Sequence, residues 1–117
     1  MAAVRRLFIA SLAAVTIASA ATGRAQGACD RQCLTDILTR YLNAMVAHDP
    51  AGAPLSPSVR FTENAAAIKV GEGLWKNLVK LRSYRLDFID PQQGVAAVHA
   101  VLEEGGAPIL FAGRSNR

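Results

Sequence analysis

The sequence predicts an α+β domain in which helices cover one face of a curved antiparallel sheet. An amphipathic pattern with the period of an α-helix runs from about Asp30 to Ala47. Short apolar or alternating runs, separated by turn residues, fill the later part of the chain from Tyr84 to Ala112. This order, with helices first and consecutive hairpin strands afterwards, is typical of an α+β layer.

The first helix is defined by an uninterrupted apolar stripe. Asp30 is a suitable N-cap, because its side chain can accept a hydrogen bond from a free backbone N–H of the first turn. Pro50 ends the helix, since the residue before a proline avoids the helical region. The stripe repeats at spacings of three and four residues through Leu34, Ile37, Leu38, Tyr41, Leu42, Met45 and Val46.

The middle of the chain predicts three short elements. The stretch from Pro50 to Ser58 contains three prolines and one glycine, so it predicts a loop with at most one helical turn. A short strand follows at Val59–Glu63, where alternate side chains would share a face. The glycine-led segment at residues 71–73 then opens a second amphipathic helix. This helix would place Leu74, Trp75, Leu78 and Val79 on one side and Lys76, Lys80 and Arg82 elsewhere.

Three antiparallel strands joined by two turns are predicted for the last third of the chain. The first strand alternates between apolar and polar residues, and the second is almost continuously apolar. The turns contain glycine, which favours hairpin connections. The strands are expected at 84–89, 95–102 and 109–112, with turns at 91–94 and 103–106.

The N-terminus predicts a cleavable export signal, residues 1–25, followed by one domain, residues 26–117. Arg5 and Arg6 supply a positive start, and the uncharged run Leu7 to Ala18 follows, with small residues before Gln26. A spanning helix needs ~20 apolar residues, and this run is shorter, so we expect no stable membrane anchor. The paired arginines are also compatible with twin-arginine export. Either route predicts a secreted or periplasmic protein.

Removal of the signal changes the charge of the protein. The whole chain has 13 basic and 9 acidic residues, which gives a formal net charge of +4. Three of the basic residues and none of the acidic ones precede Gln26, so cleavage there lowers the net charge to +1. A nearly neutral domain, without a basic stripe that alternates with aromatic residues, argues against a nucleic-acid partner.

Two cysteines, Cys29 and Cys33, lie four residues apart at the predicted start of the first helix. At this spacing their side chains can approach closely enough for a disulfide, which an oxidising compartment favours. Two free thiols or a metal-binding pair are the alternatives, but the only histidines, His48 and His99, lie far away in sequence as further ligands. The sequence therefore favours the disulfide and predicts no metal or other cofactor.

Three polar side chains stand where the pattern predicts apolar ones. Tyr41 lies in the stripe of the first helix, and Glu63 and His99 lie on apolar strand faces. Apolar neighbours disfavour the charged form of a carboxylate, which suits Glu63 to proton transfer. The alternatives are a solvent-exposed Glu63 at a frayed strand end, a Tyr41 whose hydroxyl finds one partner in the core, and a His99 on the wetter sheet face.

Short motifs surround these residues. The first helix ends in RYLNAMVAHD at residues 40–49, VRFTEN follows at residues 59–64, and GEGLW at residues 71–75. In this order the motifs resemble the first helix, first strand and glycine-led second helix of the nuclear transport factor 2-like superfamily. This group includes the ketosteroid isomerases and the SnoaL-like polyketide cyclases. The resemblance covers roughly residues 30–112. The Cys-x-x-x-Cys-Leu and His-Asp-Pro motifs are similar to those of an exported SnoaL-like branch of the superfamily.

The resemblance implies a cone-like fold, in which the curved sheet wraps around the long N-terminal helix and leaves an apolar pocket for a small molecule. In ketosteroid isomerases a helix tyrosine donates to the developing oxyanion while a strand carboxylate moves the proton. The resemblance matches Tyr41 to the tyrosine and places Glu63 near the carboxylate, so these two are the expected catalytic residues. The second oxyanion donor, an acid on a late strand, would lie at 109–112, where this chain has none. The expected ligand-binding side chains are Phe61, Trp75 and His99.

The family's sheet continues beyond the last predicted strand, so the resemblance implies that the final strands are lacking. An uncovered sheet edge invites pairing with another chain, and members of the family commonly form homodimers through the outer sheet face. The resemblance thus implies an exported domain that binds an apolar small molecule. If the domain also turns this molecule over, the implied reaction is proton transfer beside a carbonyl, as in an isomerase or cyclase. The alternative is a non-catalytic secreted module that binds another protein.

Overall fold

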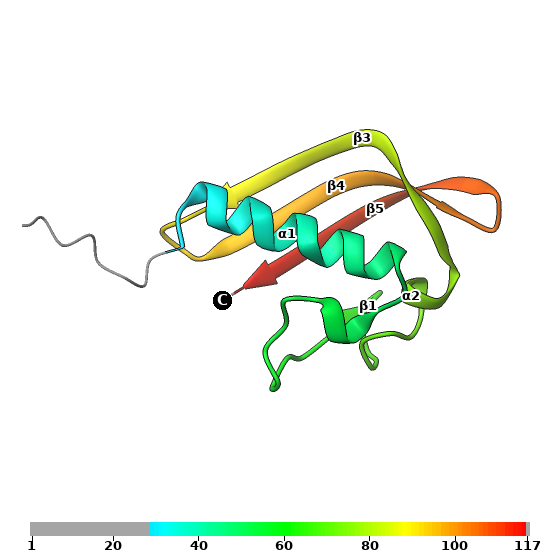
Figure 1. The fold of residues 1–117 in the computed structure, drawn as a ribbon, viewed down its shortest axis with the longest axis horizontal. Helices are drawn as coiled ribbons and strands as arrows, with labels where there is room; N and C mark the ends of the chain where they lie inside the picture. Colours follow the sequence, from blue (N-terminus) through cyan, green and yellow to red (C-terminus); the bar gives the residue numbers. More distant parts are fainter. Residues whose placement is uncertain (1–28, 117) are drawn as a thin grey trace, which may run out of the picture.

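A computed structural model describes residues 29–116 of the chain, and Figure 1 shows their arrangement. The predicted signal peptide, residues 1–25, lies outside the described residues. One long helix, α1, lies across a three-stranded antiparallel sheet, and a segment with short elements connects the two. The predicted combination of a main helix and a curved antiparallel sheet is confirmed.

Helix α1 spans Arg31–Val46, one residue inside each predicted end. The Asp30 carboxylate accepts a hydrogen bond from the backbone N–H of Cys33 at 2.9 Å, which confirms Asp30 as the N-cap. After the helix the backbone of His48 takes a positive φ of 53°, which turns the chain before Pro50. The stripe predicted from the sequence supplies the buried residues of the helix, among them Leu34, Leu38, Leu42 and Met45.

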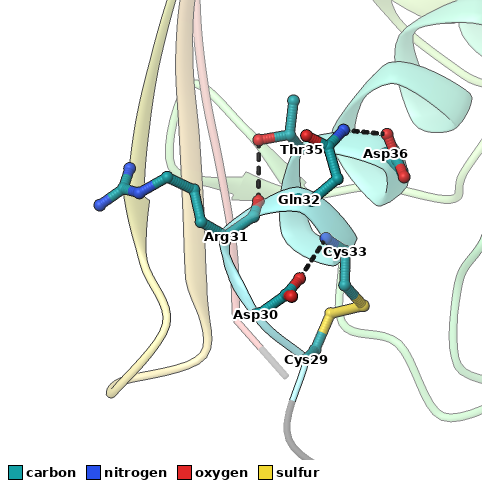
Figure 2. Close-up of a disulfide and its surroundings, with 7 residues drawn as sticks. All are labelled: Cys29, Asp30, Arg31, Gln32, Cys33, Thr35 and Asp36. Carbon is teal, nitrogen blue, oxygen red and sulfur yellow. Dashed lines mark hydrogen bonds between the residues drawn. A yellow bond between two sulfur atoms is a disulfide. The ribbon is translucent and has the colours of Figure 1, made fainter.

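A disulfide joins the first turn of α1 to a residue that lies two positions before the helix. Cys29 and Cys33 are bonded, with their Cα atoms 5.2 Å apart (Figure 2). The predicted bond is therefore confirmed, and free thiols or a metal-binding pair are not formed. Because Asp30 caps the same turn, the first turn of α1 is fixed both covalently and by a hydrogen bond.

The main sheet contains β3 (Leu78–Asp90), β4 (Val95–Glu104) and β5 (Ala107–Asn116), in the order β3-β4-β5. Strands β4 and β5 pair without interruption from Val95↔Asn116 to Glu104↔Ala107. Gly105 and Gly106 connect them, both with positive φ, as a two-residue hairpin turn requires. Strand β3 shifts register twice against β4, between residues 78 and 85, and Figure 1 shows it bending strongly in this part.

The core lies between α1 and the inner face of the sheet. Alternate residues of β4 point toward the helix and are almost completely buried: Ala96, Val98, Ala100 and Leu102. Strand β3 places two charged residues, Arg85 and Asp87, on the same face. The Arg85 guanidinium donates to both carboxylate oxygens of Asp87 at 2.8 Å and to the hydroxyl of Thr39 on α1 at 2.9 Å. These bonds satisfy the polar groups and tie the helix to the sheet.

The connecting segment contains a single 3₁₀ turn, η1 (Pro50–Gly52), as the prediction of at most one helical turn allows. The strand predicted at Val59–Glu63 is wrong in extent, because only β1 (Thr62–Glu63) forms. It pairs with β2 (Ala66–Ala67) through a turn in which Asn64 and Ala65 both take positive φ. Within residues 29–116 β1 pairs with β2 alone, and because β2 has only two residues, β1 is equally short.

The prediction of a longer second helix is also wrong. Helix α2 spans only Leu74–Asn77, and β3 begins at Leu78. From Leu78 onward the chain pairs with β4, and the Glu103 carboxylate of that strand forms ion pairs with Lys80 and Arg82. Pairing with β4 therefore overrides the helical period of the sequence.

No helix within residues 29–116 is long and apolar enough to cross a bilayer.

Replacement of Leu42 by alanine tests the core. Leu42 is 0% exposed at the centre of the α1 stripe, so its removal leaves a cavity that the packed sheet cannot fill. We expect the free energy of unfolding, measured with urea, to fall by about 2–5 kcal/mol. The neighbouring exposed residue provides the control, since Asn43→Ala should change the stability by no more than about 0.5 kcal/mol. Equal effects of the two substitutions would contradict the assignment of the buried face.

Candidate functional site

A cavity of about 880 Å³ lies between α1, the segment at residues 54–64, α2 and the end of the sheet. Four of the five side chains predicted for the site line it: Tyr41, Phe61, Glu63 and Trp75. Apolar side chains from three elements complete the wall around them: Leu38 and Met45 from α1, Val98 from β4, and Ile109 and Phe111 from β5. The volume is in the range of small-molecule sites. Polar side chains of the segment at residues 54–64 and of β5 also line it, among them Thr62, Asn64, Ser115 and Asn116.

Tyr41 and Trp75 form the polar centre of this cavity. The Trp75 indole N–H donates a hydrogen bond to the Tyr41 hydroxyl oxygen at 3.3 Å. Their rings meet edge to face, with centroids 5.5 Å apart and an interplanar angle of 84°. The oxygen of Tyr41 is thus already an acceptor, while its O–H proton goes to no acceptor within residues 29–116. Tyr41 is therefore placed to donate this proton to a ligand.

The pKa of the Tyr41 hydroxyl is raised above its ordinary value of 10.0. Burial against the core is the largest cause, and the negative charge of Glu63 acts in the same direction. The hydrogen bond from Trp75 opposes the rise but does not cancel it. At neutral pH the side chain is consequently a neutral phenol that donates hydrogen bonds.

Glu63 is held by the start of α2. Its two carboxylate oxygens accept from the backbone N–H of Leu74 at 3.0 Å and 3.3 Å. Gly73, which precedes Leu74, takes a φ of +63°. A Cβ atom at this position would lie well inside contact distance of the Glu63 carboxylate, so glycine is required here. Glu63 is half-buried and hydrogen-bonded, so it is not a solvated residue at a frayed strand end. It orients the turn that carries Trp75.

His48 supports Trp75 from the end of α1. Its Nδ1 hydrogen-bonds the backbone carbonyl oxygen of Trp75, and because a carbonyl only accepts, Nδ1 carries the proton. The sequence identified His48 only as part of the helix end. Its positive φ, at a position where few residues other than glycine fit, sends the side chain toward α2. Nothing in the local pattern predicts a contact across 27 residues.

His99 is not brought to the cavity. It shares a face of β4 with Val95, Ala97 and Val101, as predicted, but this is the outer face of the sheet. Its ring is exposed and meets the ring edge of Phe88, with centroids 5.3 Å apart. The structure thus separates His99 from the other four predicted residues and agrees with the alternative of a residue on the wetter sheet face.

Two arginines that the sequence analysis did not single out also line the cavity, Arg60 on the connecting segment and Arg114 on β5. A group of three or more His, Cys, Asp or Glu side chains suited to a metal ion does not occur in the described part of the chain. Comparison of the chain with protein-family models, curated proteins and solved structures finds no match. The site must therefore be interpreted from its own geometry.

The raised pKa of Tyr41 predicts a dependence of stability on alkaline pH. Above about pH 10 the unfolded phenol loses its proton while the folded one keeps it, so the unfolded state binds fewer protons. This contribution to stability is fully present below the unfolded pKa and is lost as the pH rises through the folded pKa. We expect the free energy of unfolding to fall less steeply between about pH 9 and pH 11 in Tyr41→Phe than in the parent. If the free energy of unfolding, measured with urea at each pH, falls equally steeply with pH in both proteins, Tyr41 is not buried as described.

The contact between Gly73 and Glu63 predicts a large difference between two glycine substitutions. Gly73 and Gly105 both have positive φ, but only Gly73 lies against another side chain, whereas a Cβ at Gly105 meets nothing within 4 Å. Gly105→Ala should cost only the backbone strain, about 1 kcal/mol. Gly73→Ala must in addition displace the Glu63 carboxylate, so it should cost more and shift the fluorescence of Trp75. A similar loss of stability in both variants, with unchanged fluorescence, would contradict the described position of Glu63.

Proposed function

We propose that this chain is an exported small domain that binds an apolar small molecule in the cavity beside Tyr41 and Trp75. In this proposal the sheet wraps around α1 as the wall of a cone-like, nuclear transport factor 2-like pocket. The observation that carries the proposal is the Tyr41 hydroxyl, which faces the cavity with its oxygen occupied by Trp75 and its proton available. A ligand with an apolar body and one acceptor oxygen, such as a ketone, matches this arrangement.

The same residues support a proposal for a reaction, proton transfer beside a carbonyl. Glu63 would take a proton from a carbon next to the carbonyl, and the C–H electron pair would move into an enolate. Tyr41 would donate its hydrogen bond to the enolate oxygen, and protonated Glu63 would return the proton to another carbon of the conjugated system. No oxidant or second substrate is needed, because the product is an isomer.

Tyr41 would donate to the oxyanion in this mechanism without the second, acidic donor that the resemblance implies. The β5 residues at 109–112 are Ile, Leu, Phe and Ala, which supply no acidic side chain. Since paired donors provide much of the stabilisation in such sites, ligand binding is the primary proposal and turnover the secondary one.

Ligand binding is tested with a pair of matched molecules. Trp75 is the only tryptophan, so its fluorescence reports binding of a fused-ring ketone and of the hydrocarbon that lacks the carbonyl oxygen. We expect the ketone to bind the parent more tightly, and Tyr41→Phe to lower its affinity by about 3–10-fold, which corresponds to one hydrogen bond. The hydrocarbon should bind both proteins alike. If neither compound binds, or if the loss is the same for both, the assigned role of Tyr41 is wrong.

Catalysis is tested separately by the isomerisation of a β,γ-unsaturated ketone. Glu63→Gln retains an acceptor oxygen for Leu74 but removes the base, so the rate should fall at least 100-fold if Glu63 transfers the proton. Circular dichroism controls for the fold. If Glu63→Gln and Tyr41→Phe turn over as fast as the parent, the mechanism fails while the binding proposal stands.

A second candidate function, a non-catalytic interaction module or homodimer, is favoured by the outer face of the sheet. Three large side chains of β3 and one of β5 are about half or more exposed there: Tyr84 at 50%, Leu86 at 47%, Phe88 at 49% and Leu110 at 73%. Apolar clusters of this kind often mark protein-binding surfaces. Sedimentation equilibrium of the parent and of Leu86→Lys distinguishes the two forms, because a dimer through this face would dissociate in the variant.

A further inference from the structure

The free edge of β5 is a second feature that needs a partner. Within the described residues β5 is the last strand of the sheet, and β4 occupies only one of its sides. A strand of ten residues with one free side leaves alternate backbone N–H and C=O groups without a strand partner.

The cavity follows this free side. Its lining includes every residue of β5 from Ile109 to Asn116, those that point inward and those that point outward. An uninterrupted run of this kind means that the cavity borders the backbone of the strand and does not merely touch one face of it. The segment at residues 54–64 forms the opposite wall, and Figure 1 shows it running beside β5 on the side away from β4.

The edge lacks the usual features that prevent strand pairing. Exposed edges are commonly blunted by charged side chains, prolines or bulges. Here the only proline, Pro108, stands at the start of the strand, residues 107–113 carry no charge, and the pairing with β4 contains no bulge. Leu110 is 73% exposed on this strand.

Two side chains of opposite charge line the cavity near the two ends of β5. Arg114 lies near the C-terminal end of β5, whereas Glu104 is the last residue of β4, next to the hairpin turn at the start of β5. Within residues 29–116 the ion pairs of basic side chains involve Lys80, Arg82 and Arg85, so Arg114 has no acidic partner there. A strand that pairs antiparallel to β5 would meet Arg114 with its N-terminal half and Glu104 with its C-terminal half.

We infer that the edge of β5 binds an extended peptide segment of another protein as an additional antiparallel strand. The segment covers about eight residues, carries an acidic residue near its N-terminal end and a basic one near its C-terminal end, and places apolar side chains at alternate positions toward the cavity. One strand needs only about 5 Å beside β5. A second copy of the chain would bring its own β4 and its own segment 54–64 to the same place, so a single extended segment fits better. The added strand closes the open wall of the cavity.

Two peptides of identical composition test the inference. The first is Ac-Glu-Val-Thr-Val-Thr-Val-Thr-Lys-amide, and the second exchanges its Glu and Lys. We expect the first to bind the purified protein several-fold more tightly at low salt, measured by calorimetry. Arg114→Gln, an exposed substitution, should reduce this preference, because it weakens the binding of the first peptide and does not weaken that of the second.

N-methylation of the first peptide tests pairing through the backbone. In an added strand every second peptide N–H points toward β5, and the others point away from it. Methylation of the first set of amides should prevent binding, and methylation of the second set should have no effect. Absence of binding at millimolar peptide, or equal effects of both sets, would overturn the inference. A dimer in sedimentation experiments that the peptide dissociates would assign the edge to a second copy and would also overturn it. None of these results depends on the small-molecule proposal.

Discussion

Side chains of α1 and β4 form the centre of the core, and α1 also carries Tyr41 of the candidate site. The core side chains are almost inaccessible to solvent, both on the helix (Leu38, Leu42 and Met45) and at the alternate positions of β4 that include Val98. Burial of this surface is the main source of stability available to a domain of this size. It also fixes the rotation of α1, which decides that Tyr41 faces the cavity and not the solvent.

Trp75 joins this core to the polar groups of the site. Trp75 is only 1% exposed. Its indole N–H donates to Tyr41, and its backbone carbonyl accepts from His48. Glu63 binds the backbone N–H of the next residue back, Leu74, and so holds the turn that carries Trp75. The groups proposed to act on a ligand therefore also hold the segment between α1 and β3 in place. A substitution at Tyr41 or Glu63 acts on structure and on binding together, which is why each experiment needs a ligand or variant that isolates one effect.

The sequence predicted those elements whose pattern has one interpretation, α1 with its N-cap and the positions of the two final strands. The last strand was predicted too short, at 109–112, and spans Ala107–Asn116. The prediction failed where two patterns fit. Leu78 and Val79 suit a helix and a strand equally, and pairing with β4 decides for the strand. Strand β4 is apolar on both faces, so alternation alone did not show that His99 points outward. Tyr41, Phe61, Glu63 and Trp75 do meet at one cavity, but the hydrogen bonds among them depend on tertiary contacts that no local pattern contains.

The connection between β4 and β5 has a consequence for the order of folding. Two glycines join strands whose ten residue pairs are all close in sequence, so this hairpin closes only short loops and can form within about 1–10 μs. The contact between Thr39 and Arg85, in contrast, joins positions 46 residues apart. We therefore expect α1 to dock after the hairpin has formed, because a much larger loop must close, and this loop contains Glu63 and Trp75. The cavity would then be completed on a hairpin that is already in place.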